Sequence, residues 1–172
     1  NLLTVKNAYI EASFDKITGQ LVTLVMNGQQ VVSQGGGFVY DNHRWIENDK
    51  FTETGNGLSE KGTCTVTEEK GNIIVATNRE GSLCSTDIVY TFTQTGVMDM
   101  EVVFRPHTAD LRRCGLVANI DSTLNNIDYY AYGPWENYND RKDGCMVGRY
   151  TTTVEDMEVP YMKPQSMGNR EG

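Results

Sequence analysis

Glu136 and Asp140 are two carboxylic acids in one short segment, and a pair of carboxylic acids can supply the proton donor, base or nucleophile of a reaction. They lie four positions apart, beside Trp135 and Tyr138. Two carboxyl groups held about 5 to 5.5 Å apart can act as acid and nucleophile on a glycoside, and two held about 6.5 to 9.5 Å apart can act as acid and base. Spacing on a loop fixes neither distance. The sequence favours a structural alternative, in which Glu136 caps backbone amides and Asp140 pairs with Arg141 or another arginine.

The same segment offers oxygen atoms to a hard cation such as calcium. Asn137, Asn139, Asp140 and Asp143 are the candidate ligands. Their order does not match the spacing of an EF-hand loop, and Arg141 stands where a ligand should be. We therefore expect no metal site in this chain.

The histidines and cysteines form no recognisable catalytic or metal-binding motif. His43 and His107 are the only histidines, and no GxSxG or HExxH motif surrounds them. No CxxC pair is present. We expect structural histidines and buried free thiols, with one disulfide bridge as the alternative. The cysteines are Cys64, Cys84, Cys114 and Cys145.

Aromatic residues concentrate in two irregular segments, 38–56 and 129–141. Flat rings beside amides and carboxylates suit a sugar-contacting surface, because a ring stacks on the apolar face of a pyranose while polar groups bind its hydroxyls. The same composition suits a protein interface, or simple packing beneath a long loop. The three interpretations stay open here. The rings are Trp45, Tyr129, Tyr130, Tyr132, Trp135 and Tyr138.

The pattern of apolar residues along the chain predicts β-strands. Apolar residues recur with period two, and loop residues interrupt them regularly. The dipeptide Asn27-Gly28 predicts a two-residue type I′ turn. We expect two packed antiparallel sheets and no closed barrel. The predicted strands cover 10–14, 21–26, 29–32, 63–67, 73–77, 84–92 and 98–104, and a further pair is predicted at 115–120 and 127–132.

Length and charge narrow the class of protein. A chain of 172 residues can bury a core as a single domain, so we expect one domain over 1–172. The net charge of −8 argues against a nucleic-acid binder, because binding to phosphates needs clustered cations. No apolar run approaches the ~18 residues that span a bilayer. No nucleic-acid or membrane partner is therefore expected.

Residues 133–141, here called the signature, read GPWENYNDR. They resemble the G-P-x-E-N-Y-x-D-R motif of the C-terminal small-chain domain of β-galactosidases, the large multidomain enzymes of glycoside hydrolase family 2. Two further segments also match motifs of this family. Residues 156–171 match D-M-x-x-P-Y-x-x-P-Q-x-x-G-x-R-x, and residues 14–21 match F-D-x-x-T-G-x-L. Segment 39–49, VYDNHRWIEND, departs from the family's R-A-P-x-D-N-D except at its final Asn-Asp.

This resemblance implies a two-sheet antiparallel supersandwich, similar to that of galactose mutarotases and truncated at its C-terminus. In such enzymes the catalytic glutamates and the metal ligands lie in a TIM barrel, so the resemblance implies that this chain alone is inactive and holds no cofactor. Its partners would be the remainder of the β-galactosidase, with the barrel and flanking sandwiches, and a β-galactoside. Residues for carbohydrate or interdomain contact would be Trp45, Trp135, Glu136, Asn137, Tyr138, Asp140 and Arg141.

Two further expectations follow. A truncated sandwich leaves an unpaired edge strand, through which the chain could associate with a second copy. The alternative function is a free-standing carbohydrate-binding module. An aldose epimerase is a weaker alternative that depends on fold analogy alone, and the two isolated histidines argue against it.

Overall fold

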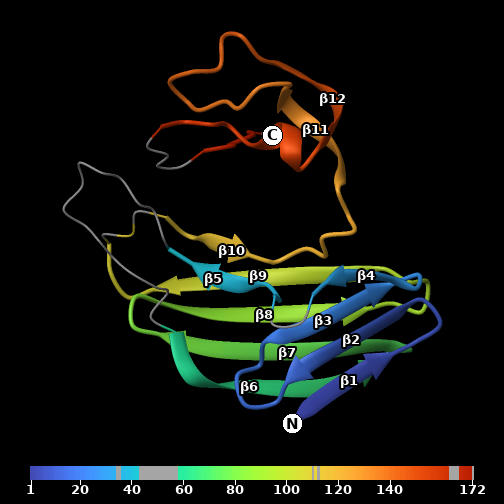
Figure 1. Ribbon diagram of the computed structural model, residues 1–172. Helices are drawn as coiled ribbons and strands as arrows, with labels where there is room; N and C mark the ends of the chain where they lie inside the picture. The colour runs from blue at the N-terminus through green and yellow to red at the C-terminus, as the bar shows by residue number, and fades with distance from the viewer. Residues whose placement is uncertain (34–35, 43–57, 110, 112, 163–166, 172) are drawn as a thin grey trace. The chain divides into compact units, whose positions relative to one another are not determined.

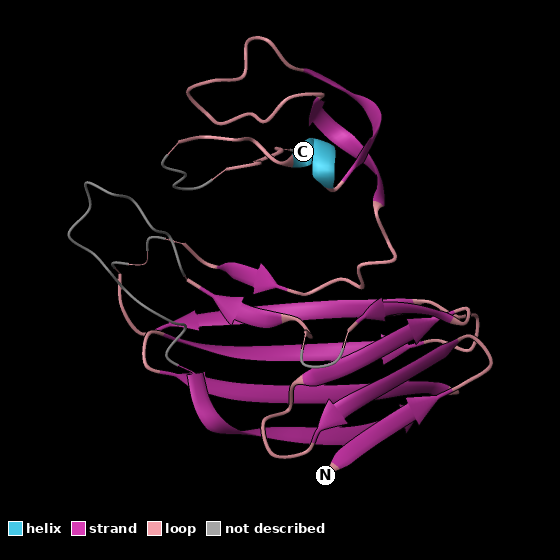
Figure 2. Cartoon of the chain, in the orientation of Figure 1, coloured by secondary structure: helices cyan, strands magenta, loops and turns pink. Residues whose placement is uncertain are grey.

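The computed structural model describes residues 1–33, 36–42, 58–109, 111, 113–162 and 167–171. The chain divides into two compact units. Unit 1 comprises Asn1–His43 and Thr54–Asp121, and unit 2 comprises Arg44–Glu53 and Ser122–Gly172. The described residues form antiparallel strands and one short 3₁₀ turn, which confirms the all-β prediction (Figure 2). The single domain over 1–172 stays a prediction.

The first sheet of unit 1 has the order β1-β2-β3-β4 (Figure 1). Its β3–β4 turn adopts the positive φ angles that a type I′ turn requires, 51° at Asn27 and 77° at Gly28. The predicted turn is therefore confirmed. The strands are β1 (Leu2–Lys6), β2 (Ile10–Asp15), β3 (Leu21–Met26) and β4 (Gln29–Val32).

The second sheet of unit 1 has the order β6-β7-β8-β9, and every neighbouring pair is antiparallel. A smaller sheet pairs β5 with β10. The strands are β6 (Leu58–Glu69), β7 (Asn72–Gly81), β8 (Cys84–Phe92), β9 (Met98–Pro106), β5 (Val39–Asp41) and β10 (Gly115–Val117).

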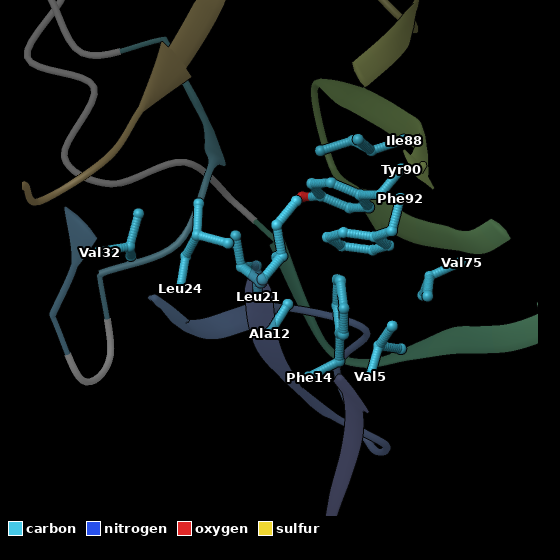
Figure 3. Packing of buried hydrophobic residues seen from close by; sticks show 11 residues of the cluster. Val5, Ala12, Phe14, Leu21, Leu24, Val32, Val75, Ile88, Tyr90 and Phe92 are labelled. Carbon is cyan, nitrogen blue, oxygen red and sulfur yellow. The ribbon is translucent and has the colours of Figure 1, made fainter. Parts of the chain in front are cut away.

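The core of unit 1 lies between the two four-stranded sheets. Phe14 of β2 is fully buried and packs edge-on against Tyr90 and Phe92 of β8, with ring centroids 5.1 and 6.2 Å away (Figure 3). Burying a side chain of this size contributes roughly 1.5–3 kcal/mol to folding. The alternation that predicts these strands places their apolar residues on the inner faces. The cluster also contains Val5, Ile10, Ala12, Leu21, Leu24, Val32, Val75 and Ile88.

Unit 2 contains a two-stranded antiparallel sheet of β11 (Asn126–Gly133) and β12 (Met146–Thr153), followed by η1 (Glu155–Met157). The predicted pairing of 115–120 with 127–132 is therefore wrong, because β10 pairs with β5. The backbone beyond β10 bonds within unit 1: Asn119 N–H donates to Gly36 O over 2.8 Å, and Asp121 N–H to Val31 O over 2.9 Å. Alternation predicts a strand, but it does not specify the strand's partner.

The cysteines and His107 are only partly as predicted. All four thiols are free, but only Cys84 is buried; Cys64 and Cys145 are half-buried and Cys114 is exposed. The prediction of four buried thiols is therefore wrong, because Cys64 is on the edge strand β6 and Cys114 lies outside the strands. His107 Nε2 lies 2.7 Å from the hydroxyl of Ser85, in agreement with a structural histidine. His43 lies outside the described residues.

Candidate functional site: the signature and its cleft in unit 2

The signature begins where β11 ends. The Gly133–Pro134 peptide bond is cis, and the Pro134 carbonyl accepts a hydrogen bond of 3.1 Å from the Tyr129 hydroxyl. The following residue, Trp135, is 71% exposed. The backbone at Pro134 is therefore hydrogen-bonded to a side chain of β11, while the indole ring of Trp135 projects into solvent.

The Glu136 carboxylate accepts hydrogen bonds from several parts of unit 2. Oε1 accepts from Arg141 Nη2 at 2.5 Å and from the Tyr161 hydroxyl. Oε2 accepts from the Gly168 backbone N–H at 2.9 Å and from the Tyr138 hydroxyl at 3.4 Å. The side chain is only 8% exposed. Glu136 therefore joins the signature to the segments around 161 and 168.

The electrostatic surroundings of Glu136 favour its charged form. Burial by itself would raise the pKa of this carboxyl group, but the hydrogen bonds from Tyr161 and Gly168 and the charge of Arg141 outweigh burial and lower the pKa below its ordinary value. A general acid at neutral pH needs the opposite shift. Glu136 is thus a poor proton donor in this arrangement.

Asn137 is the most buried residue of the signature, with no exposed surface. Its Nδ2 donates to Tyr132 O at 2.9 Å and to Trp135 O at 3.4 Å, while its Oδ1 accepts from Glu171 N–H at 2.9 Å. Its backbone N–H donates to Asn169 O at 2.8 Å, and its backbone carbonyl accepts from Asn169 Nδ2 at 2.6 Å. Asn137 therefore binds the C-terminal segment through both its side chain and its backbone.

Arg141 folds the end of the signature into a turn by its contacts with Tyr138. Tyr138 and Arg141 exchange backbone hydrogen bonds of 3.3 and 2.9 Å, and the guanidinium lies 5.2 Å from the centre of the Tyr138 ring. The structure pairs Arg141 with Glu136, and Asp140 is exposed in the turn. The expected pairing of Asp140 with Arg141 or another arginine stays a prediction. The expectation that Glu136 accepts from a backbone amide holds at Gly168.

A second set of contacts fixes residues 169–171 beside the end of β11. Tyr132 N–H donates to Glu171 O at 2.8 Å, and Lys142 Nζ lies 3.3 Å from a Glu171 carboxylate oxygen. The same ammonium group lies 5.6 Å from the centre of the Tyr132 ring. We call the contacts made by Glu136, Asn137 and Lys142 to Tyr161, Gly168, Asn169 and Glu171 the signature clamp.

An open cleft of about 950 Å³ adjoins the signature clamp. Glu136 and Asp140 both line it, and the hydrogen bonds of the Glu136 carboxylate come from Arg141, Tyr161, Gly168 and Tyr138 rather than from Asp140, whose side chain is exposed. Within the same described ranges, no group of three or more His, Cys, Asp or Glu side chains is placed to hold a metal ion. The principal lining residues are Tyr129, Trp135, Glu136, Arg141, Tyr150 and Tyr161.

Of the seven predicted contact residues, four line the cleft: Trp135, Glu136, Asp140 and Arg141. Asn137 is fully buried, and neither it nor Tyr138 is among the lining residues. Trp45 lies outside the described residues. Sequence reasoning did not assign a role to Tyr161, Gly168 and Glu171. The first two were visible only as matching positions in the flanking motif, and spacing carried no signal that they contact Glu136.

The described part of the chain contains no helix with the length and apolar character needed to cross a membrane.

The fold and the signature clamp define an all-β domain in which Glu136 and Asn137 make internal contacts. Comparison with known proteins gives the family: the family described as "Beta galactosidase small chain" matches residues 6–172. The chain belongs to the β-galactosidase small chain family. The resemblance seen in the sequence is thereby confirmed.

Individual relatives agree with this family. A β-galactosidase of Priestia megaterium is 25% identical over 185 residues, covering 98% of this chain and 17% of that protein. A β-galactosidase of Enterobacter cloacae is 28% identical over 137 residues, covering 76% of this chain and 13% of that protein. One from Streptococcus thermophilus is 45% identical over 58 residues, 34% of this chain and 6% of that protein. The chain spans less than a fifth of the length of these relatives.

Proposed function

We propose that this chain is a non-catalytic domain of a β-galactosidase, an enzyme that hydrolyses terminal β-D-galactosides with retention. In this proposal the chain is part of a mutarotase-like supersandwich, and the catalytic glutamates and the metals belong to a barrel elsewhere in the polypeptide. The relatives support this arrangement, because this chain corresponds to 17% of the Priestia megaterium protein and leaves ample length for a barrel.

The observation that carries the proposal is the arrangement of Glu136. Its carboxylate is buried and accepts hydrogen bonds from Arg141, Tyr161 and Gly168. A catalytic carboxyl group must reach its substrate and must have a pKa suited to proton transfer or nucleophilic attack. The lowered pKa of Glu136 makes it unsuited to the role of general acid, and both of its oxygens accept hydrogen bonds from groups of its own domain, which supports a structural role over that of a nucleophile.

The function of the signature in this proposal is to hold unit 2 in one conformation beside the barrel. A two-stranded sheet such as β11–β12 is marginally stable by itself in water. The signature clamp adds contacts between the segment that joins β11 to β12 and the residues Tyr161, Gly168, Asn169 and Glu171. In this proposal these contacts stabilise the surface that unit 2 presents to its neighbours. Association of two copies through an edge strand stays a prediction, which light scattering of the purified chain tests.

The experiment is a hydrolysis assay with an aryl β-galactoside. The purified chain should release no more aryl alcohol than a heat-denatured sample. Reproducible turnover that disappears in Glu136→Gln or Asp140→Asn would refute the proposal, since these two residues supply the carboxyl groups of the signature. The variant Asp143→Asn serves as the matched control, because Asp143 also lines the cleft but lies outside the signature.

A free-standing carbohydrate-binding module is the second candidate, and the exposed Trp135 at the cleft favours it. The two candidates differ in the polypeptide that carries the chain. A native protein several times heavier than this chain, with galactosidase activity, agrees with the first. A native protein of about the size of this chain agrees with the second.

A further inference from the structure

Cys84 and Cys114 are two free thiols that the fold of unit 1 brings together. Cys84 is the first residue of β8 and is fully buried, whereas Cys114 is exposed and directly precedes β10. The two side chains interact directly with each other. Cys84 Sγ also donates to the Ser85 carbonyl at 3.4 Å, which orients the buried thiol. The pair therefore consists of one sulfur that solvent can reach and one enclosed sulfur beside it.

Strand pairing brings the two cysteines together independently of this side-chain contact. Thr86 of β8 stands opposite Phe104 of β9, and the Phe104 ring lies 6.0 Å from the ring of Tyr40 in β5. Tyr40 in turn stands opposite Leu116 of β10. Thr86 and Leu116 each follow one of the cysteines by two positions. Since a strand rises about 3.3 Å per residue, both thiols lie close to this one packed group.

The environment of the pair makes a disulfide slow to form and slow to break. Partial desolvation and the neighbouring Cys84 thiol raise the pKa of the Cys114 thiol above its ordinary value, so little thiolate is present at neutral pH. The same shift makes Cys114 a poor leaving group once it is in a disulfide, because thiols of high pKa leave slowly. A fast redox sensor needs a low thiol pKa. The pair therefore suits a stabilising bridge.

We propose that Cys84 and Cys114 form a disulfide bridge in the presence of a small disulfide such as oxidised glutathione. The exposed Cys114 thiolate attacks the small disulfide, forms a mixed disulfide and releases one thiol. Cys84 then gives up its proton and attacks Cys114 Sγ, and the second small thiol leaves with that proton. In total, the two protein thiols lose two electrons and two protons, and one small disulfide is reduced to two thiols. The bridge does not depend on the proposed function.

The bridge joins the start of β8 to the segment before β10. It closes the part of the chain that contains β9, and this restricts the unfolded chain far more than the folded one. Because the thiols already meet in folded unit 1, little rearrangement is needed. The equilibrium constant for unfolding of unit 1 should fall about 30- to 1,000-fold when the bridge forms.

The experiment incubates the purified full chain with mixtures of reduced and oxidised glutathione, then measures the intact mass, the linked peptides and the urea midpoint. The bridge should lower the mass by about 2 Da, one hydrogen atom for each sulfur, link the peptides that contain Cys84 and Cys114, and raise the midpoint. Cys114→Ser should lose all three effects. The double variant Cys64→Ser/Cys145→Ser is the matched control, because it removes the other two thiols and should keep all three effects.

Three results would overturn the proposal. The first is no loss of 2 Da at any ratio of oxidised to reduced glutathione, whether the chain stays unreacted or carries a lasting glutathione adduct. The second is linkage of Cys114 to Cys64, to Cys145 or to a second copy of the chain in place of Cys84. The third is an equal equilibrium constant for bridge formation in the folded and the urea-unfolded chain, because the fold would then contribute nothing to the pairing.

Discussion

Replacing Asn137 with alanine should release the C-terminal segment from the signature. The substitution deletes two side-chain hydrogen bonds of 2.9 Å, to Tyr132 O and from Glu171 N–H, and a weaker one of 3.4 Å to Trp135 O. The bonds made by the backbone of residue 137 stay available: its N–H donates to Asn169 O, and its carbonyl accepts from Asn169 Nδ2. The variant therefore tests the side-chain part of the signature clamp.

The expected loss of folding free energy in Asn137→Ala follows from the burial of Asn137 and of its hydrogen-bond partners. Each of the two short bonds contributes roughly 1 kcal/mol, and leaving a buried partner unpaired adds about 1 kcal/mol or more. Asn137 has no exposed surface, so the deleted carboxamide also leaves a void. Together these give about 3 kcal/mol, which is a large fraction of the ~5–15 kcal/mol that holds a typical domain folded.

The assay is amide hydrogen exchange followed by mass spectrometry or NMR. A loss of about 3 kcal/mol corresponds to a fall of about two orders of magnitude in the protection of the Tyr132 and Glu171 amides. Asn139→Ala is the matched control, because Asn139 is an exposed amide in the same turn, and it should change protection little. Unchanged protection of both amides in Asn137→Ala would refute the reasoning.

Two further predictions concern pH and backbone packing. The lowered pKa of Glu136 means that its contribution to stability is complete above its ordinary pKa and is lost as the pH falls through the lower folded value. The urea midpoint of unit 2 should therefore decline below about pH 4.5, and this decline should be shallower in Glu136→Gln; parallel declines would contradict it. A Cβ atom at Gly37 would lie 1.7 Å from Leu21 O, whereas one at Gly115 would meet nothing within 4 Å. Thermal unfolding of unit 1 should thus show Gly37→Ala destabilised by roughly 3 kcal/mol or more and Gly115→Ala nearly unchanged; equal midpoints would contradict this.

Local patterns in the sequence predicted most of unit 1. Asn27-Gly28 specifies its own turn, because few other dipeptides tolerate two positive φ angles, and the turn brings its flanking strands together. Strand β12 was missed. Its residues MVGRYTTT carry little apolar alternation, since its side chains are mostly exposed or half-buried. The pairing of β10 was misassigned because Val39–Asp41, its partner, lies far away in the chain.

The contact partners of the site residues were also not predictable from local sequence patterns. The structural role of Glu136 was predictable from its neighbourhood, but its choice of partners was not. The Gly168 N–H that it binds lies 32 residues away, and a backbone donor has no sequence signature. The Asn137 carboxamide likewise bonds to the backbone of Tyr132 and Glu171, which any residue types could supply.

We propose that Glu136 and Asp140 serve the structure of the domain and break no glycosidic bond. Release of aryl alcohol from an aryl β-galactoside by the purified chain, compared with heat-denatured protein, tests this. No difference between the two samples is expected. Turnover by the folded chain that is abolished in Glu136→Gln would contradict it.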